Sequence, residues 1–292
     1  MTPLDSAWLA AHPLPLPDQD TDKNARGRVL AVGGSEKVPG ALRITGEAAL
    51  RAGAGKLQLA TPERVALQLG LHMPEAAVFP LPVNETGELA ASCGQRIAAL
   101  LDRCDTLVLG PGTGADCPAG DIMSAALADP AEILTIVLDA AAIAAAADLR
   151  DLIRNHRGRV VFTPHPGEMA QLMDCDEAQV TDDPDAIARA AADRFAATIV
   201  LKGPETCIAS PGEDMLLYPG GGPGLATGGS GDALAGIIGG LLARGASPRI
   251  AAAWGVWLHG EAGRRLAERI GAIGFLGREL PAEIPALLDA AR

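Results

Sequence analysis

The chain has 292 residues, of which 48% are hydrophobic but only 3% aromatic, so a sizeable core must be built from small aliphatic side chains. This composition suits helices packed on a buried parallel sheet. The net charge of −12 argues against a general nucleic-acid surface, which needs a basic stripe, but it leaves room for phosphate binding by backbone amides at a helix N-terminus.

Apolar runs and helical patterns alternate along the chain. Residues 1–27 are rich in proline and aspartate and are expected to form an irregular lead-in. Strands are predicted at residues 28–32, 56–60, 106–109, 133–138, 159–162 and 198–201, and helices at 41–55, 62–69, 97–101, just after 139, and at 185–196. Residues 206–209 and 215–218 flank the turn SPGED and predict an antiparallel hairpin, and helices follow at 233–243, 251–269 and 281–290. This order predicts an α/β fold in one domain over residues 28–292, with a mostly parallel sheet and helices on both faces.

Glycine-rich and polar segments follow the predicted strands or lead into the next helix. They occupy residues 33–41, 110–114, 163–168, 202–206 and 220–232. In open α/β sheets, ligands bind outside the carboxyl ends of the strands. We therefore expect these segments to share one rim and one cleft.

The segment GGGPGLATGGSGD, residues 220–232, leads into a helix and is the sharpest signal. Gly228, Gly229 and Gly231 allow successive amides to point at one spot, and the helix adds its positive dipole end. The segment predicts an anion hole in which Asp232 would take a proton from a hydroxyl beside a bound phosphate. The alternative is an ordinary turn with Asp232 at a helix start. The segment is not a P-loop, because no GK[ST] follows the glycines.

A second segment, TPHPGE, holds His165 between Pro164 and Pro166. A residue before proline is restricted to extended geometry, so His165 is stiffly mounted, and we expect it to contact a ligand. Pro166 suits the first position of a helix, and Glu168 suits its first turn, either as a cap or as a site residue. The remaining histidines have no partnered spacing and are interpreted as structural: His12, His72, His156 and His259.

Three further features lie at strand ends. Lys202 would place a cation near phosphates, against the alternative of a solvated surface lysine. The loop GPGTG, residues 110–114, is either a point of close approach to a ligand or a simple tight turn. Asp139 would either hold Mg²⁺ through water or cap the next helix.

Cysteine spacing and the N-terminus indicate the compartment. The five cysteines are widely spread without a CxxC pair, which fits a reducing compartment better than disulfides or a zinc cluster. The N-terminus shows no basic region followed by an apolar run, and the longest apolar stretches fall short of the roughly 18 residues of a membrane span. We expect a cytoplasmic protein that binds neither membranes nor nucleic acids.

The segments together resemble a known family. GRVLAVGGSEKVPGA, RAGAGKLQLATPE, LGPGTG, TPHPGEMAQL, KGPET and PGLATGGSGDALAGIIGGLLARG, in this order, resemble the ADP- or ATP-dependent NAD(P)H-hydrate dehydratases of the ribokinase-like superfamily. The resemblance runs from about residue 25 to the end of the chain. It implies a ribokinase-like fold and an enzyme of metabolite repair.

The resemblance also implies a reaction. NADH or NADPH hydrated at C6 of the nicotinamide ring would be phosphorylated on that hydroxyl, by ADP in bacterial-type members and by ATP in others. Phosphate would then leave and restore the double bond, so the enzyme would be a carbon–oxygen lyase, with Mg²⁺ accompanying the nucleotide. Many relatives carry a fused epimerase for the two hydrate epimers, which would here be a separate chain, and homotetramers are frequent among the parent domains.

Motif matching assigns site residues through this resemblance. Asp232 would be the catalytic base. The hydrated dinucleotide would contact Ala41, Gly112, Gly114, His165 and Asp232. The adenine nucleotide would contact Lys202, Gly203, Pro204, Glu205, Thr206, Gly228, Gly229, Ser230 and Gly231. The candidates for a metal site are Asp139 and Glu168.

The chain departs from the family pattern at three positions. The family usually reads LDADALN where this chain has Asp139 followed by Ala141 and Ala144, and it often has Asn in place of Gly222. Two other functions stay open: a kinase of the same fold acting on a hydroxymethyl or hydroxyethyl group of a vitamin precursor, and a non-catalytic nucleotide-binding relative. HPGE together with PGLATGGSGD favours the dehydratase over the kinase, and retention of Asp232 favours an enzyme over a binder.

Overall fold

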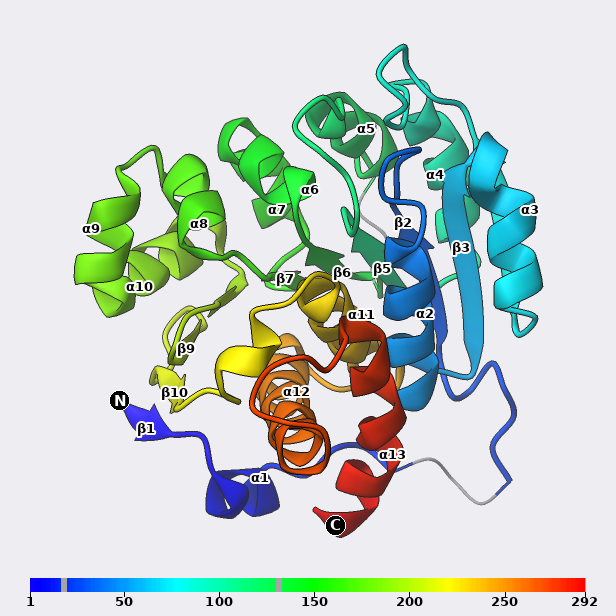
Figure 1. The fold of residues 1–292 in the computed structure, drawn as a ribbon. Coiled ribbons are helices and arrows are strands. Elements are labelled where there is room, and N and C mark those ends of the chain that lie inside the picture. The colour runs from blue at the N-terminus through cyan, green and yellow to red at the C-terminus, as the bar shows by residue number, and fades with distance from the viewer. Residues whose placement is uncertain (17–19, 130–132, 292) are drawn as a thin grey trace.

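The structure, a computed structural model, describes residues 1–16, 20–129 and 133–291. Its strands form a ten-stranded sheet in the order β1-β10-β9-β8-β7-β6-β5-β2-β3-β4 (Figure 1). β9 runs antiparallel to both of its neighbours, and the other pairs are parallel, which confirms the expected α/β class. The strands are β1 (Thr2–Pro3), β2 (Arg28–Val32), β3 (Lys56–Pro62), β4 (Ala76–Leu81), β5 (Thr106–Leu109), β6 (Thr135–Leu138), β7 (Val160–Phe162), β8 (Thr198–Leu201), β9 (Thr206–Ala209) and β10 (Leu216–Tyr218).

Helices cover both faces of this sheet (Figure 1). They are α1 (Ser6–Ala11), α2 (Ala41–Arg51), α3 (Glu63–His72), α4 (Cys93–Leu101), α5 (Ala119–Ala126), α6 (Ala141–Ala145), α7 (Arg150–Asn155), α8 (Pro166–Met173), α9 (Glu177–Asp182), α10 (Pro184–Phe195), α11 (Ser230–Ala243), α12 (Pro248–Arg269) and α13 (Leu280–Ala290). In the described part of the chain, none of them combines the length and apolar character needed to cross a bilayer.

Alternate side chains of the central strands feed two separate cores. Val108 and Val137 pack with α2, α11, α12 and α13 on one face. Leu107, Leu109 and Ile136 pack with α4, α5, α6 and α10 on the other. Successive strand residues point to opposite faces, so a strand buried on both sides must be apolar throughout. This explains the continuous aliphatic runs TLVL and TIVL of β5, β6 and β8.

The expectation of an irregular lead-in over residues 1–27 is wrong for its first half. β1 pairs in parallel with β10 and extends the sheet at that edge. α1 begins where the Asp5 side chain accepts a hydrogen bond from the Trp8 amide, and Leu9 is fully buried. The indole of Trp254 on α12 donates to the His12 carbonyl at 2.9 Å and ties this segment to the core.

Several further elements were not predicted, among them β4, α5, α7 and α9. β4 contains Pro80, which counts against a strand, but β4 lies at the sheet edge, where a missing amide hydrogen is tolerated. α5 follows the GPGTG loop. Strand β6 begins at Thr135 rather than at residue 133, and Ile133 is exposed. The predicted hairpin of β9 and β10 is confirmed.

Candidate active site

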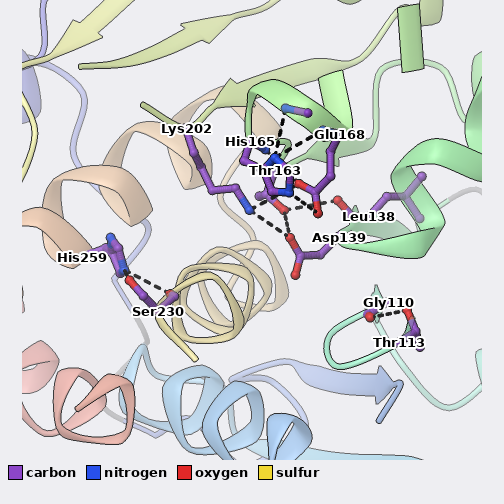
Figure 2. Close-up of polar contacts among 11 residues, drawn as sticks. Gly110, Thr113, Leu138, Asp139, Thr163, His165, Glu168, Lys202, Ser230 and His259 are labelled. Carbon is purple, nitrogen blue, oxygen red and sulfur yellow. Dashed lines mark hydrogen bonds and ion pairs between the residues drawn. The ribbon is translucent and has the colours of Figure 1, made fainter. Parts of the chain in front are cut away.

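Loops at the carboxyl ends of β6, β7 and β8 bring Asp139, Thr163 and Lys202 together (Figure 2). Asp139 is 4% exposed, and the Thr163 hydroxyl donates to its Oδ1 at 2.7 Å. Lys202 Nζ lies 3.5 Å from Asp139 Oδ1 and 3.7 Å from Glu168 Oε2. Because parallel strands end at one edge, residues far apart in sequence form a single polar cluster there.

The cluster sets the protonation of Lys202 and Asp232. Burial opposes a charge on Lys202, but the carboxylates of Asp139, Glu168 and Asp232 outweigh it and raise the pKa of Lys202. Burial, helped by the nearby charge of Asp139 and opposed by Lys202, raises the pKa of Asp232 to about 6. Asp232 is therefore ionised at neutral pH and still a far stronger base than an ordinary aspartate, as general-base catalysis requires.

The glycine loop turns into α11 beside this cluster. Gly229 has φ +88°, a conformation that side chains other than glycine rarely adopt, and a Cβ there would also meet Ile44 at 2.6 Å. The first intrahelical bond runs from the Ala233 amide to the Gly229 carbonyl, and the Ser230 amide donates to Thr227. The amides of Gly231 and Asp232 have no acceptor within the helix, so they can bind an anion.

His165 and Glu168 form the N-terminal cap of α8. His165 Nδ1 accepts from the amides of Gly167 at 3.1 Å and Glu168 at 3.3 Å, and Glu168 Oε2 accepts from the His165 amide at 2.8 Å. The helix-cap alternative for Glu168 is confirmed, and the same carboxylate also faces Lys202. Since Nδ1 is an acceptor, the neutral ring carries its proton on Nε2.

The loops at residues 33–41 and 110–114 pack closely against each other. Gly112 has φ +72°, and a Cβ there would collide with Ala41. The Gly114 amide donates to Oε2 of Glu88 at 3.1 Å. Glu88 is 3% exposed and lies in a loop that gave no signal in the sequence.

Two cavities flank the cluster. The larger cavity has a volume of about 840 Å³, and its wall includes Lys202, Gly203, Pro204, Thr206, Ser230, Gly231 and His259. The second cavity has a volume of about 680 Å³, and its wall includes Gly114, Ala141, Ala144 and Glu168. His165 lines both and stands between them. The walls of these two cavities do not include Ala41, Gly112, Glu205, Gly228, Gly229 or Asp232.

His259 was interpreted from the sequence as structural, but it lies in the wall of the larger cavity. Its Nε2 is 2.9 Å from Ser230 Oγ and 3.1 Å from the Ser230 carbonyl oxygen (Figure 2). Packing of α12 against α11 brings the two residues together, although 29 positions separate them. The spacing of histidines alone carries no signal for such a contact.

The two candidate metal ligands form ion pairs with a lysine of the protein. Asp139 and Glu168 both face the Lys202 ammonium group. Within residues 1–16, 20–129 and 133–291, no group of three His, Cys, Asp or Glu side chains gathers as a metal site. These residues do not form a protein cage for Mg²⁺.

Solved structures define the class of the fold. A ribokinase-like superfamily protein from Enterococcus faecalis superposes with a TM-score of 0.84 at 28% identity, covering 100% of this chain and 96% of that one. The ADP/ATP-dependent NAD(P)H-hydrate dehydratase from Bacillus subtilis, co-crystallised with ATP and Mg²⁺, gives a TM-score of 0.83 at 28% identity, covering 100% and 99%. The fold is therefore ribokinase-like.

Sequence comparison places the chain within that class. The family model for NAD(P)H-hydrate dehydratase matches residues 29–286. The ADP-dependent (S)-NAD(P)H-hydrate dehydratase of Xanthomonas campestris is 46% identical over 286 residues, covering 97% of this chain and 95% of that protein. The bifunctional NAD(P)H-hydrate repair enzyme of Moorella thermoacetica is 38% identical over 98% of this chain but 53% of its own length. This chain belongs to the NAD(P)H-hydrate dehydratase family.

Proposed function

We propose that this protein uses ADP to convert hydrated NADH and NADPH back to the intact cofactors. The observation that carries the proposal is the position of Asp232. This carboxylate has a pKa of about 6 and stands at the amide-rich start of α11, beside Lys202. A base next to an anion site is what phosphorylation of a hydroxyl requires. The likeness to the ADP-dependent enzyme of Xanthomonas campestris over nearly the whole chain supports the choice of substrates.

The two cavities suit two ligands. The larger cavity runs from Lys202 and Thr206 to Gly231, so we assign it to the adenine nucleotide, with its phosphates toward the start of α11. The second cavity, which reaches Gly114 and Glu168, takes the hydrated dinucleotide. His165 contributes to both walls, so the two ligands would meet beside it. Of the other residues implied by the family motif, Ala41 and Gly112 would act by shaping the loop next to the second cavity, because they pack on each other.

The residues present support a two-step reaction. Asp232 accepts the proton of the C6 hydroxyl. The hydroxyl oxygen attacks the terminal phosphoryl group of ADP, and AMP leaves. The amides of Gly231 and Asp232 and the Lys202 ammonium stabilise the charge on the transferring group. The C6–O bond then breaks with its electron pair leaving on phosphate, a proton leaves the neighbouring ring carbon, and the double bond returns. Phosphate is a good leaving group and hydroxide a poor one, which explains the need for a nucleotide.

Mg²⁺ is best assigned to the nucleotide rather than to a resident site. Magnesium is commonly held by one or two carboxylates together with substrate phosphates, where it neutralises their charge. Asp139 is the nearest candidate carboxylate, but it already faces Lys202 and accepts from Thr163. The protein groups described above therefore account for positioning without a preformed metal cage.

The test is a coupled assay with NADHX and either ADP or ATP. The expected result is recovery of absorbance at the reduced-nicotinamide wavelength, with one AMP formed per NADH when ADP is supplied. A kinase of a vitamin precursor would instead convert a hydroxymethyl or hydroxyethyl substrate into a stable phosphate ester and leave NADHX unchanged. A non-catalytic relative would bind nucleotide and turn over neither substrate. The raised pKa of Asp232, which suits a general base, argues against this alternative.

The same proposal extends to partners. This chain spans about half the length of the bifunctional relatives, which suggest that an epimerase activity supplies the correct hydrate epimer. We further propose that the protein is cytoplasmic and forms a homotetramer, by analogy with dehydratase domains of this family. Size-exclusion chromatography with light scattering would decide the oligomeric state.

A further inference from the structure

The environment of His259 fixes which ring nitrogen carries the proton. Nε2 lies within hydrogen-bond distance of the Ser230 carbonyl oxygen, which can only accept, so Nε2 must be the donor. A bare Nε2 would set two lone pairs against each other at 3.1 Å. Burial lowers the pKa of His259 to about 4, and the nearby Lys202 adds to this effect, so the ring is neutral at pH 7 and has a single N–H.

That single N–H decides the role of the Ser230 hydroxyl. Ser230 Oγ lies 2.9 Å from the same Nε2, so it shares the histidine proton as an acceptor. The hydroxyl hydrogen of Ser230 is then not used in this contact. Ser230 is 5% exposed. Both Ser230 and His259 line the larger cavity. The hydroxyl is therefore a pre-oriented donor next to the amides of Gly231 and Asp232.

We propose that His259 is a positioning residue for phosphate binding: by donating to both oxygens of Ser230, it holds the serine hydroxyl with its proton directed at a phosphate oxygen of the nucleotide. This inference rests on the proposed assignment of the larger cavity to a nucleoside di- or triphosphate. It adds a side-chain donor to the backbone anion hole, since a hydroxyl makes a charge-assisted bond to phosphate. In this proposal His259 acts through Ser230.

Three variants and two ligands test the dyad. His259→Leu fills the space with an apolar side chain and removes the hydrogen-bond donor. His259→Gln places an amide N–H close to the position of the histidine Nε2. His72→Leu, at an exposed position near the end of α3, is the matched control. Calorimetric titration with ADP and with adenosine separates phosphate binding from binding of the nucleoside, and melting temperatures are recorded for every variant.

The expected result is selective. His259→Leu should weaken ADP binding at least tenfold and leave adenosine binding within about twofold of the wild type. His259→Gln should return ADP affinity to within about threefold, and His72→Leu should match the wild type in all titrations. A purely structural histidine would affect both ligands together. Wild-type ADP affinity in His259→Leu, an equal loss of adenosine binding, or failure of the glutamine to restore ADP affinity would overturn the inference.

Ser230→Ala keeps the test decisive if His259→Leu does not fold. It removes only the hydroxyl, so it should weaken binding of ADP but not of adenosine. Where His259→Leu does fold, adding it to Ser230→Ala should reduce ADP affinity much less than it does in the wild-type background. A Ser230→Ala protein with full ADP affinity would exclude the dyad. Failure of the wild-type protein to bind ADP at all would instead refute the proposed function.

Discussion

Replacing Asp232 by asparagine should have opposite effects on activity and stability. The pKa of Asp232 is raised from 3.8 to about 6, so the folded protein disfavours its charge. Each pKa unit corresponds to about 1.4 kcal/mol, which gives about 3 kcal/mol for the penalty on the ionised form. This penalty already includes the attraction to Lys202, so we expect Asp232→Asn to stabilise the fold by up to about 3 kcal/mol at pH 7.5. Turnover should fall by about 10²- to 10⁴-fold, because the general base is lost.

The sign of the pH dependence follows from proton binding. Between pH 3.8 and about 6 the folded state holds a proton on Asp232 that the unfolded state releases, so this group makes stability fall as pH rises through that window. The difference in stability between variant and wild type should be largest above pH 6 and shrink toward pH 4. In the wild type, kcat/KM should decline on the acid side below about pH 6, as the base becomes protonated.

Urea unfolding at several pH values and steady-state assays with NADHX and ADP measure the two effects. Asp193→Asn, at an exposed position on α10, is the control for loss of a surface carboxylate and should alter neither quantity appreciably. A folded Asp232→Asn protein with near-native turnover would show that Asp232 is not the base. An unchanged or reduced stability at pH 7.5 would show that its charge is not disfavoured by the fold.

Substitutions at three further positions probe the remaining parts of the site. Gly231→Val should fold, because Gly231 has no positive φ and a Cβ there lies 3.5 Å from Lys202 Nζ. It should weaken ADP binding at least tenfold by filling the space between that ammonium group and the start of the helix. Calorimetry with AMP, ADP and ATP checks this, and unaltered binding by a folded variant would remove the glycine loop from the phosphate site. His165→Ala should weaken binding of the dinucleotide more than binding of ADP, and it should lower the stability of the fold by about 1 kcal/mol through loss of the α8 cap. An equal loss of affinity for both ligands in titrations would contradict the assignment. Lys202→Met should reduce ADP affinity and destabilise the fold by about 3 kcal/mol, because Asp139 and Glu168 lose their cation. Lys202→Arg should have a milder effect. Chemical unfolding that shows no loss of stability for the methionine variant would disprove the role of the ion pairs.

Local pattern was enough to predict most of the elements of the sheet. The runs that form β2, β5 and β8 are apolar on both faces and are bounded by glycine or polar segments, so their ends could be placed to the residue. The helix after the glycine loop was predictable from its apolar run, but α11 begins at Ser230, three residues before the predicted start at residue 233. Pattern failed where tertiary context overrides it: Pro80 is acceptable only because β4 is an edge strand, and β1 is a strand only because β10 offers it a partner.

The sequence by itself determined the fold class, the glycine loop with Asp232 and the stiff mounting of His165. Only the tertiary structure decided which groups meet: Lys202 with Asp139 and Glu168, Ser230 with His259, and Gly114 with Glu88. The physical reason is that backbone preferences act over a few residues, whereas hydrogen bonds and ion pairs require side chains to meet within about 3–4 Å. Parallel strand order and the packing of α12 on α11 create those meetings across separations of up to 63 residues, and no local pattern encodes them.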